Sequence, residues 1–247
     1  MFKSPRRAFQ VDDWLGLLTV TIIFSLWFVS LANLITISIG DTSWIWVTVA
    51  IAVRSYLHTG LFILAHDSMH GNLIPRDRRL NDLIGNIAVS IYGFLPYEHC
   101  RKNHTDHHQY PSQSGDPDFH GGLAHPFFWY CKFIREYFPL RSLFTFLINM
   151  SIIFWGLIIV FHVSMINLVL FWLVPLVLSS LQLFYFGTYL PHRHTYNNPN
   201  FSPRLVSNVY LNVWSFVSCY NFGHYHWEHH EYPKTPWYRL SKIHGQE

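Results

Sequence analysis

Three groups of histidines stand out in a chain that is otherwise mostly apolar. The first is a pair four residues apart, and the other two share the spacing H-x-x-H-H. They are His66 and His70; His104, His107 and His108; and His226, His229 and His230. On a helix, residues three or four apart lie on one face, so the imidazoles of each group can reach a common site. Imidazole is a ligand for zinc, copper, iron and nickel, and the three groups together predict a metal centre.

The spacing also indicates how many metals are held. Adjacent helical residues lie about 100° apart around the axis, so His107 and His108 can serve different metals. A structural zinc site closes with four ligands, whereas eight or nine histidines are enough for two metals with positions left open. The chain has no E-x-x-H motif of ferritin-like di-iron proteins, and H-W-E-H-H is not the H-E-x-x-H of zinc proteases. Two irons in a nearly all-nitrogen site are therefore expected.

Carboxylates close to these histidines in sequence are expected to orient the ligating imidazoles through their other N–H groups. The candidates are Asp67, Asp106, Asp116 and Asp118. The spacing leaves open which of them do so, and it also leaves open the roles of His120, His194 and His224.

Long apolar runs must position these residues. About 20 apolar residues cross a bilayer, and four runs qualify, at 14–37, 44–65, 143–161 and 168–190. Segments 83–95 and 205–222 are shorter or interrupted by polar residues, and they fit interfacial or re-entrant helices. Only 13% of the residues are charged, against about 25% in soluble domains. The expected fold is one domain over 1–247, an all-α integral membrane protein with about four transmembrane helices and a cytoplasmic histidine-rich cap.

The distribution of Lys and Arg predicts which side the cap occupies. The turns after the first and third runs contain neither residue, whereas 16 of the 17 Lys and Arg lie in the N-terminus, in 66–141 or after 191. The positive-inside rule then places both termini and every histidine group on the cytoplasmic side. Six full spans would give the same sidedness. Arg54, inside the second run, either faces a polar pocket with His58 or stabilises packing between spans. A net charge of +3 is too small to indicate nucleic-acid binding.

The histidine spacing resembles that of the membrane fatty-acid desaturase/hydroxylase superfamily. The phrases A-H-D-S-M-H-G, D-P-D-F-H, F-G-T-Y-L-P-H-R and H-W-E-H-H-E-Y-P are more specifically similar to bacterial and cyanobacterial β-carotene 4-ketolases. The resemblance implies a membrane oxygenase with two irons and O₂ that oxidises C4 and C4′ of β-ionone rings, taking β-carotene to echinenone and canthaxanthin, with ferredoxin or a similar electron donor. It also implies a further ligand after the last span, for which His192 is the candidate. The family often has His at the position of Asn221 and Gly at that of His224, so neither is expected to be a ligand.

A metal face beside a membrane implies a lipophilic substrate that enters from the lipid and an electron donor that docks on the basic side. The stretch P-F-F-W-Y, followed by Lys132 and Arg135, predicts an amphipathic interfacial helix. Its expected role is anchoring, and the alternative is the floor of a substrate tunnel. Three other functions stay open at this point: a carotenoid hydroxylase, a fatty-acyl desaturase and a membrane protein that transfers electrons through haem.

Overall fold

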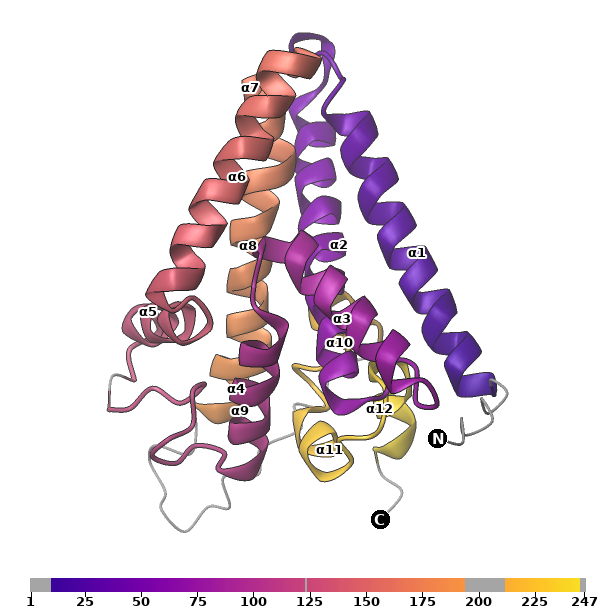
Figure 1. Cartoon of the computed structure of the whole chain (residues 1–247), viewed down its shortest axis with the longest axis vertical. Coiled ribbons are helices and arrows are strands. Elements are labelled where there is room, and N and C mark those ends of the chain that lie inside the picture. Colours follow the sequence, from indigo (N-terminus) through magenta and orange to yellow (C-terminus); the bar gives the residue numbers. More distant parts are fainter. Residues whose placement is uncertain (1–9, 123, 194–211, 245–247) are drawn as a thin grey trace, which may run out of the picture.

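The computed structural model describes residues 10–122, 124–193 and 212–244, and this part of the chain is helical with no strand. Four helices in it are long and apolar enough to cross a membrane (Figure 1). They are α1 (Val11–Leu34), α2 (Trp44–His70), α6 (Leu140–Phe161) and the continuous helix Met165–His192. The last is built from α7 (Met165–Leu168), η2 (Val169–Leu173), α8 (Val174–Gln182), η3 (Leu183–Tyr189) and α9 (Leu190–His192). The four predicted spans are thus confirmed, with ends that differ by a few residues.

The second span is longer than its apolar run suggested. The run ends at 65, but α2 continues through the polar residues after it to His70 and stops at Gly71, whose φ of 78° favours glycine. The whole first histidine pair is therefore carried on the last turn of a membrane-spanning helix.

The outer surface of the long helices is apolar. Of the most apolar stretch of α6 only 6% is buried, and Ile152, Ile159 and Phe161 are each more than 60% exposed. Such a face is unfavourable in water, whereas in lipid the helical backbone satisfies its own polar groups and the side chains match the solvent.

Shorter helices gather toward one end of the long ones (Figure 1). They are α3 (Arg78–Gly93), α4 (Tyr97–Gln109), α5 (Pro126–Tyr137), α10 (Asn212–Cys219), α11 (His226–Glu231) and α12 (Leu240–Ile243), with the 3₁₀ turn η5 (Trp237–Arg239). The 3₁₀ turn η1 (Ile39–Asp41) lies at the opposite end, between α1 and α2 (Figure 1).

The two short apolar segments fall in this group. Segment 83–95 lies mostly in α3, whose 16 residues measure about 24 Å, short of a hydrocarbon core of roughly 30 Å. The length of α3 agrees with the interfacial or re-entrant prediction for segment 83–95. Residues 205–211 lie outside the described part, so the same prediction for segment 205–222, which contains α10, stays a prediction.

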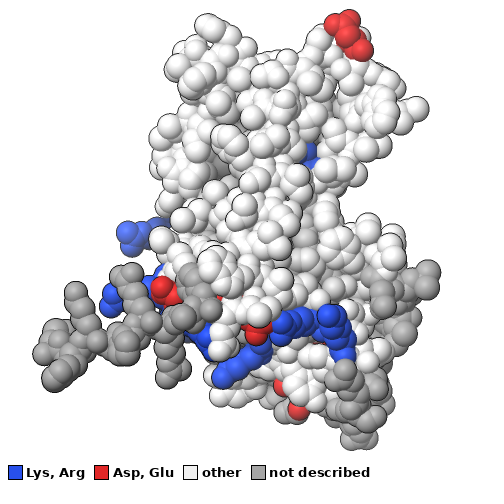
Figure 2. All heavy atoms as spheres, turned by 90° about the vertical axis from the view of Figure 1, so that its right-hand side faces the viewer, with Lys and Arg blue, Asp and Glu red and all other residues white. Residues whose placement is uncertain are grey.

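Charged side chains follow the same division. Figure 2, which faces the α1 side, shows Lys and Arg gathered toward the end where the short helices lie, with a largely uncharged surface above them. Arg54, in the second span, is completely buried. Its guanidinium donates to the backbone carbonyls of Trp27 (2.6 Å) and Phe171 (3.1 Å), and it lies 4.9 Å from the Trp27 ring. It thereby ties α1, α2 and η2 together, which favours the packing interpretation over a polar pocket.

Candidate metal centre

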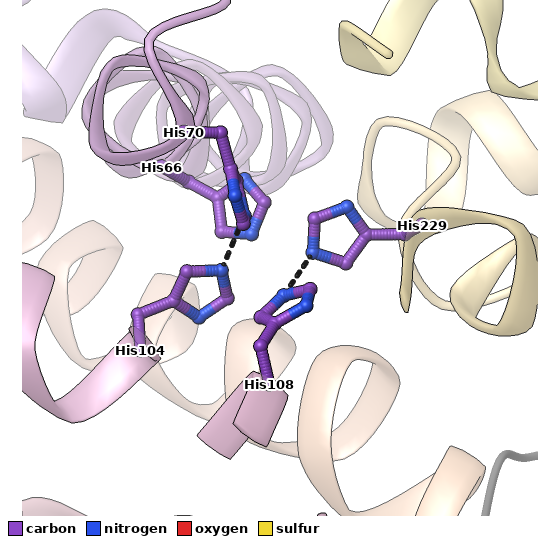
Figure 3. A group of neighbouring side chains, drawn as sticks. All are labelled: His66, His70, His104, His108 and His229. Carbon is purple, nitrogen blue, oxygen red and sulfur yellow. Dashed lines mark hydrogen bonds between the residues drawn. The ribbon is translucent and has the colours of Figure 1, made fainter. Parts of the chain in front are cut away.

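Five histidines from three separate parts of the chain converge at the end of α2, and we call them the first histidine group. Their ligand nitrogens all lie within 4.8 Å of one another. As Figure 3 shows, the rings point toward a common centre, with Nε2–Nε2 distances of 2.7 Å between His70 and His104 and 2.9 Å between His108 and His229. The group consists of His66 and His70 from α2, His104 and His108 from α4, and His229 from α11.

Four further histidines form a second histidine group beside the first. Its members are His107 from α4, His192 from α9, and His226 and His230 from α11. Their Nε2 atoms are separated by 3.0 Å (His192 to His226), 3.0 Å (His226 to His230) and 3.1 Å (His230 to His107). The rings of His108 and His230 stack at 4.1 Å, so the two groups are in direct contact.

Each H-x-x-H-H helix contributes to both groups. On α4 the i, i+4 pair His104 and His108 joins the first group and His107 joins the second. On α11 the i, i+4 pair His226 and His230 joins the second group and His229 joins the first. The division follows the roughly 100° between adjacent positions. All nine predicted histidines are placed, and none is left outside the two groups.

The donor set fits metal ions. A neutral imidazole carries only one proton on its two nitrogens. Several Nε2 atoms of the second group lie about 3 Å from each other. Where neither of two facing nitrogens carries a proton, both lone pairs are available to a metal ion. Burial lowers the pKa of His104, His229 and His230 well below the usual value, and neighbouring imidazoles lower it further. The rings are therefore neutral, which is the form that binds metal.

One carboxylate orients a ring of the second group. The Nδ1–H of His107 donates to Oδ1 of Asp116 at 2.9 Å, so its Nε2 lone pair points into the group. Both residues are buried. Burial alone would lower the pKa of His107, but the carboxylates of Asp118 and Asp116 raise it above the usual value. Of the four predicted carboxylates, Asp116 has the geometry expected of an orienting group.

The other three carboxylates are placed differently. Asp118 is buried and acts electrostatically on His107, and burial raises the pKa of Asp118 to about 6. Asp67 lies 3.7 Å from Nδ1 of His66 and accepts the backbone N–H of Trp237, so it helps to hold the tail against α2. Asp106 faces away and pairs with Lys102 at 2.5 Å on the exposed side of α4.

The remaining histidine candidates lie outside both groups. His120 accepts the backbone N–H of Gly122 and packs at 4.9 Å against the Trp129 ring. His224 lies 3.3 Å from the Ser218 hydroxyl and beside Phe186. His194 falls outside the described residues.

Two contacts at the site were not predicted. The Ser112 hydroxyl lies 2.9 Å from Nδ1 of His192, and Glu228 of α11 pairs with His244 after α12. Ser112 is in a loop, 80 positions away from His192, and no spacing rule connects the two residues.

A cavity of about 60 Å³ opens directly beside the two groups. Imidazoles from both groups and Asp118 form its polar wall, and Phe62, Phe133, Leu183 and Phe222 are among its apolar walls. Phe133 and Tyr137 come from the buried face of α5, whereas Phe127 and Phe128 are more than 50% exposed. The expectation that α5 only anchors the chain is therefore incomplete, because its inner face also lines the cavity.

Comparison with known proteins shows the family of the chain. Residues 42–247 match the family described as fatty acid desaturase. The chain is 36% identical over 201 residues to a beta-carotene ketolase of Paracoccus sp. (strain PC1), covering 78% of this chain and 76% of that protein. It is 35% identical over 226 residues to a zeaxanthin 4-ketolase of Chlamydomonas reinhardtii, a match that covers 89% of this chain and 49% of that protein. It is 37% identical over 213 residues to beta-carotene 4-ketolase 3 of Haematococcus lacustris, covering 81% of this chain and 63% of that protein. The chain thus spans about half to two thirds of the length of these two algal relatives. The chain is an integral membrane protein that belongs to the fatty acid desaturase family, and within that family it is related over most of its length to the carotenoid ketolases.

Proposed function

We propose that the chain is an O₂-dependent β-carotene ketolase that introduces keto groups at C4 and C4′ of β-ionone rings. The observation that carries the proposal is the cavity, which has both histidine groups on one wall and aromatic and aliphatic side chains on the others. A hydrocarbon ring would lie against the apolar walls with one carbon facing the metals. The names of the relatives support the choice of ring and position.

The nine grouped histidines are the proposed ligands of two irons, five for one ion and four for the other. When bound, the irons supply the reduction of O₂ that hydroxylation of an allylic carbon requires. Each hydroxylation consumes one O₂, two electrons and two protons and releases one water. Two hydroxylations of the same carbon give a geminal diol, which loses water to form the ketone.

The side chains of the protein provide orientation and a dry environment for this reaction. Asp116 fixes the ring of His107, and the Ser112 hydroxyl contacts His192. Phe62, Phe133 and Phe222 keep water from the apolar side of the cavity. At about 60 Å³ the cavity has room for only a few waters. Entry of a ring therefore requires the lining side chains to turn aside, as side chains at binding sites commonly do.

The proposal includes an orientation in the membrane. The end that carries the short helices also carries the Lys and Arg side chains, and the positive-inside rule assigns it, with both termini, to the cytoplasm of a bacterial or cyanobacterial cell. An acidic electron donor such as ferredoxin would dock there, and the carotenoid would arrive from the lipid. We treat the chain as one domain, because the first histidine group draws on α2, α4 and α11 and the second on α4, α9 and α11.

The test is expression in cells that accumulate β-carotene. We expect a red shift of the pigment, echinenone and canthaxanthin in the extract, and O₂-dependent turnover that scales with iron in the purified protein. Hydroxylated carotenoids without ketones would indicate a hydroxylase. Unchanged carotene with altered acyl chains would indicate a desaturase. A Soret band in the purified protein would indicate haem and overturn the assignment.

A further inference from the structure

A second hollow lies at the level of the membrane spans. It is a groove of about 520 Å³, within the range of ligand-binding pockets. Its walls come from α2 (Val53, Leu57), from α8 (Leu178, Gln182) and from α10 (Val217). Most of its side chains are apolar, and Val53 and Leu178 are 51% and 40% exposed on the outer surface.

The groove and the metal-side cavity are both lined by residues of α2, of the span Met165–His192 and of α10 or the residues next to it. Gln182 and Val217 line the groove, whereas Leu183 and Cys219, one and two positions further along, line the cavity. On α2 the groove ends at Leu57 and the cavity begins at Phe62, about 8 Å along the helix. The two hollows therefore follow one another along the same helices.

The side chain of Gln182 lies between residues that line the groove and residues that line the cavity. The Thr59 hydroxyl donates to Oε1 of Gln182 at 2.5 Å, and Nε2 of Gln182 donates to the Ser218 carbonyl at 2.5 Å. The amide thus bridges α2, α8 and α10. A flexible side chain forms this bridge, and its two hydrogen bonds are of the kind that is worth only about 1 kcal/mol in membranes.

A long rod-shaped substrate needs space outside the cavity. If one β-ionone ring lies beside the metals, the polyene and the second ring must leave through a wall. The polar walls are occupied by the histidine groups, and the groove continues the apolar side toward the lipid.

We propose that the groove between α2, α8 and α10 holds the polyene of the carotenoid while its ring is oxidised, and that the chain crosses between groove and cavity at Gln182. This proposal rests on the proposed function. An ordinary lipid acyl chain is the competing occupant of the groove.

The test fills the groove and compares a neighbouring position. Leu178→Trp places an indole in the groove, whereas Val177→Trp places one at the adjacent position of α8, which is 50% exposed and is not a groove residue. Both variants and the wild type are expressed in β-carotene-accumulating cells. Three quantities are measured: ketone formed, iron per chain, and β-carotene retained per chain after purification.

We expect Leu178→Trp to lower ketone formation by up to about 10²-fold, because a displaced polyene moves the reacting carbon. Retained β-carotene should fall with it, iron per chain should stay at the wild-type value, and Val177→Trp should match the wild type in all three. Equal turnover and equal retained carotene in the two variants would overturn the proposal and assign the groove to lipid. A loss of iron in Leu178→Trp alone would overturn it too, since the groove would then be part of the metal fold. A wild type without ketone would instead refute the proposed function.

Discussion

The orientation of His107 by Asp116 leads to a sharp prediction for the variant Asp116→Asn. The carboxylate accepts the His107 Nδ1–H at 2.9 Å and also the backbone N–H groups of Ser112 (2.7 Å) and Asp118 (2.8 Å). An asparagine keeps the size of the side chain but replaces one acceptor oxygen with an NH₂ donor. If this NH₂ faces His107, Nδ1 becomes the acceptor and the proton moves to Nε2, where the metal lone pair is needed.

The expected loss of metal affinity or activity can be given as a range. Removing an outer partner of a metal-bound histidine lowers metal affinity or activity by about 10- to 100-fold, which corresponds to about 1.4–2.8 kcal/mol. Because the defect is confined to the second histidine group, we expect one of two metals to become labile, so that iron per chain falls toward half of the wild-type value after mild chelation.

The assay is metal analysis after timed exposure to a chelator, together with ketone formation. Asp106→Asn is the matched control, since Asp106 pairs with Lys102 on the exposed side of α4, and such pairs contribute about 0–1 kcal/mol. An Asp116→Asn protein that resists chelation as well as the wild type and the control would refute the argument that this carboxylate sets the tautomer of His107.

Three other variants or pairs of variants test the metal groups and the packing of the helices. His229→Ala should abolish turnover and remove the metal of the first group, whereas His224→Ala should keep both metals, as judged by metal analysis; the reverse result would contradict the grouping. Gly85→Ala should destabilise the protein by about 1–3 kcal/mol in detergent unfolding, since its Cβ would lie 2.3 Å from the Ser68 hydroxyl oxygen. Gly156→Ala, in open space on α6, should stabilise by about 0.5–1 kcal/mol, and equal effects of the two would contradict the close packing of α3 on α2. Gln182→Leu removes both bridging hydrogen bonds and should cost about 1 kcal/mol in the same assay, and an unchanged stability would show that the bridge is not maintained in the membrane.

Much of the arrangement could be predicted from the sequence because two periodicities are strong. Apolar runs longer than 18 residues predict spans, and the H-x-x-H-H spacing predicts both the shared faces and the separation of neighbouring rings. The end of α2 was predicted five residues too early, because hydropathy falls at Asp67 and Ser68 while the helix continues to Gly71. The contribution of α5 to the cavity was underestimated, although its buried residues Trp129, Phe133 and Tyr137 recur every four positions.

Contacts between distant segments were beyond prediction. The pairing of Ser112 with His192 depends on where a loop and a helix end meet, and the bridge from Thr59 through Gln182 to Ser218 depends on the packing of three helices. Neither is encoded in a local period, so only the folded structure reveals them.

The two histidine groups draw their members from different stretches of the sequence, and this affects when each group is completed during synthesis. Four of the five members of the first group precede residue 109, so they can meet while the ribosome is still translating the rest of the chain. The second group has only His107 from that early portion and waits for His192, His226 and His230. During synthesis from the N-terminus, the first group therefore has four of its five histidines early, whereas the second gains three of its four only when the chain is nearly finished.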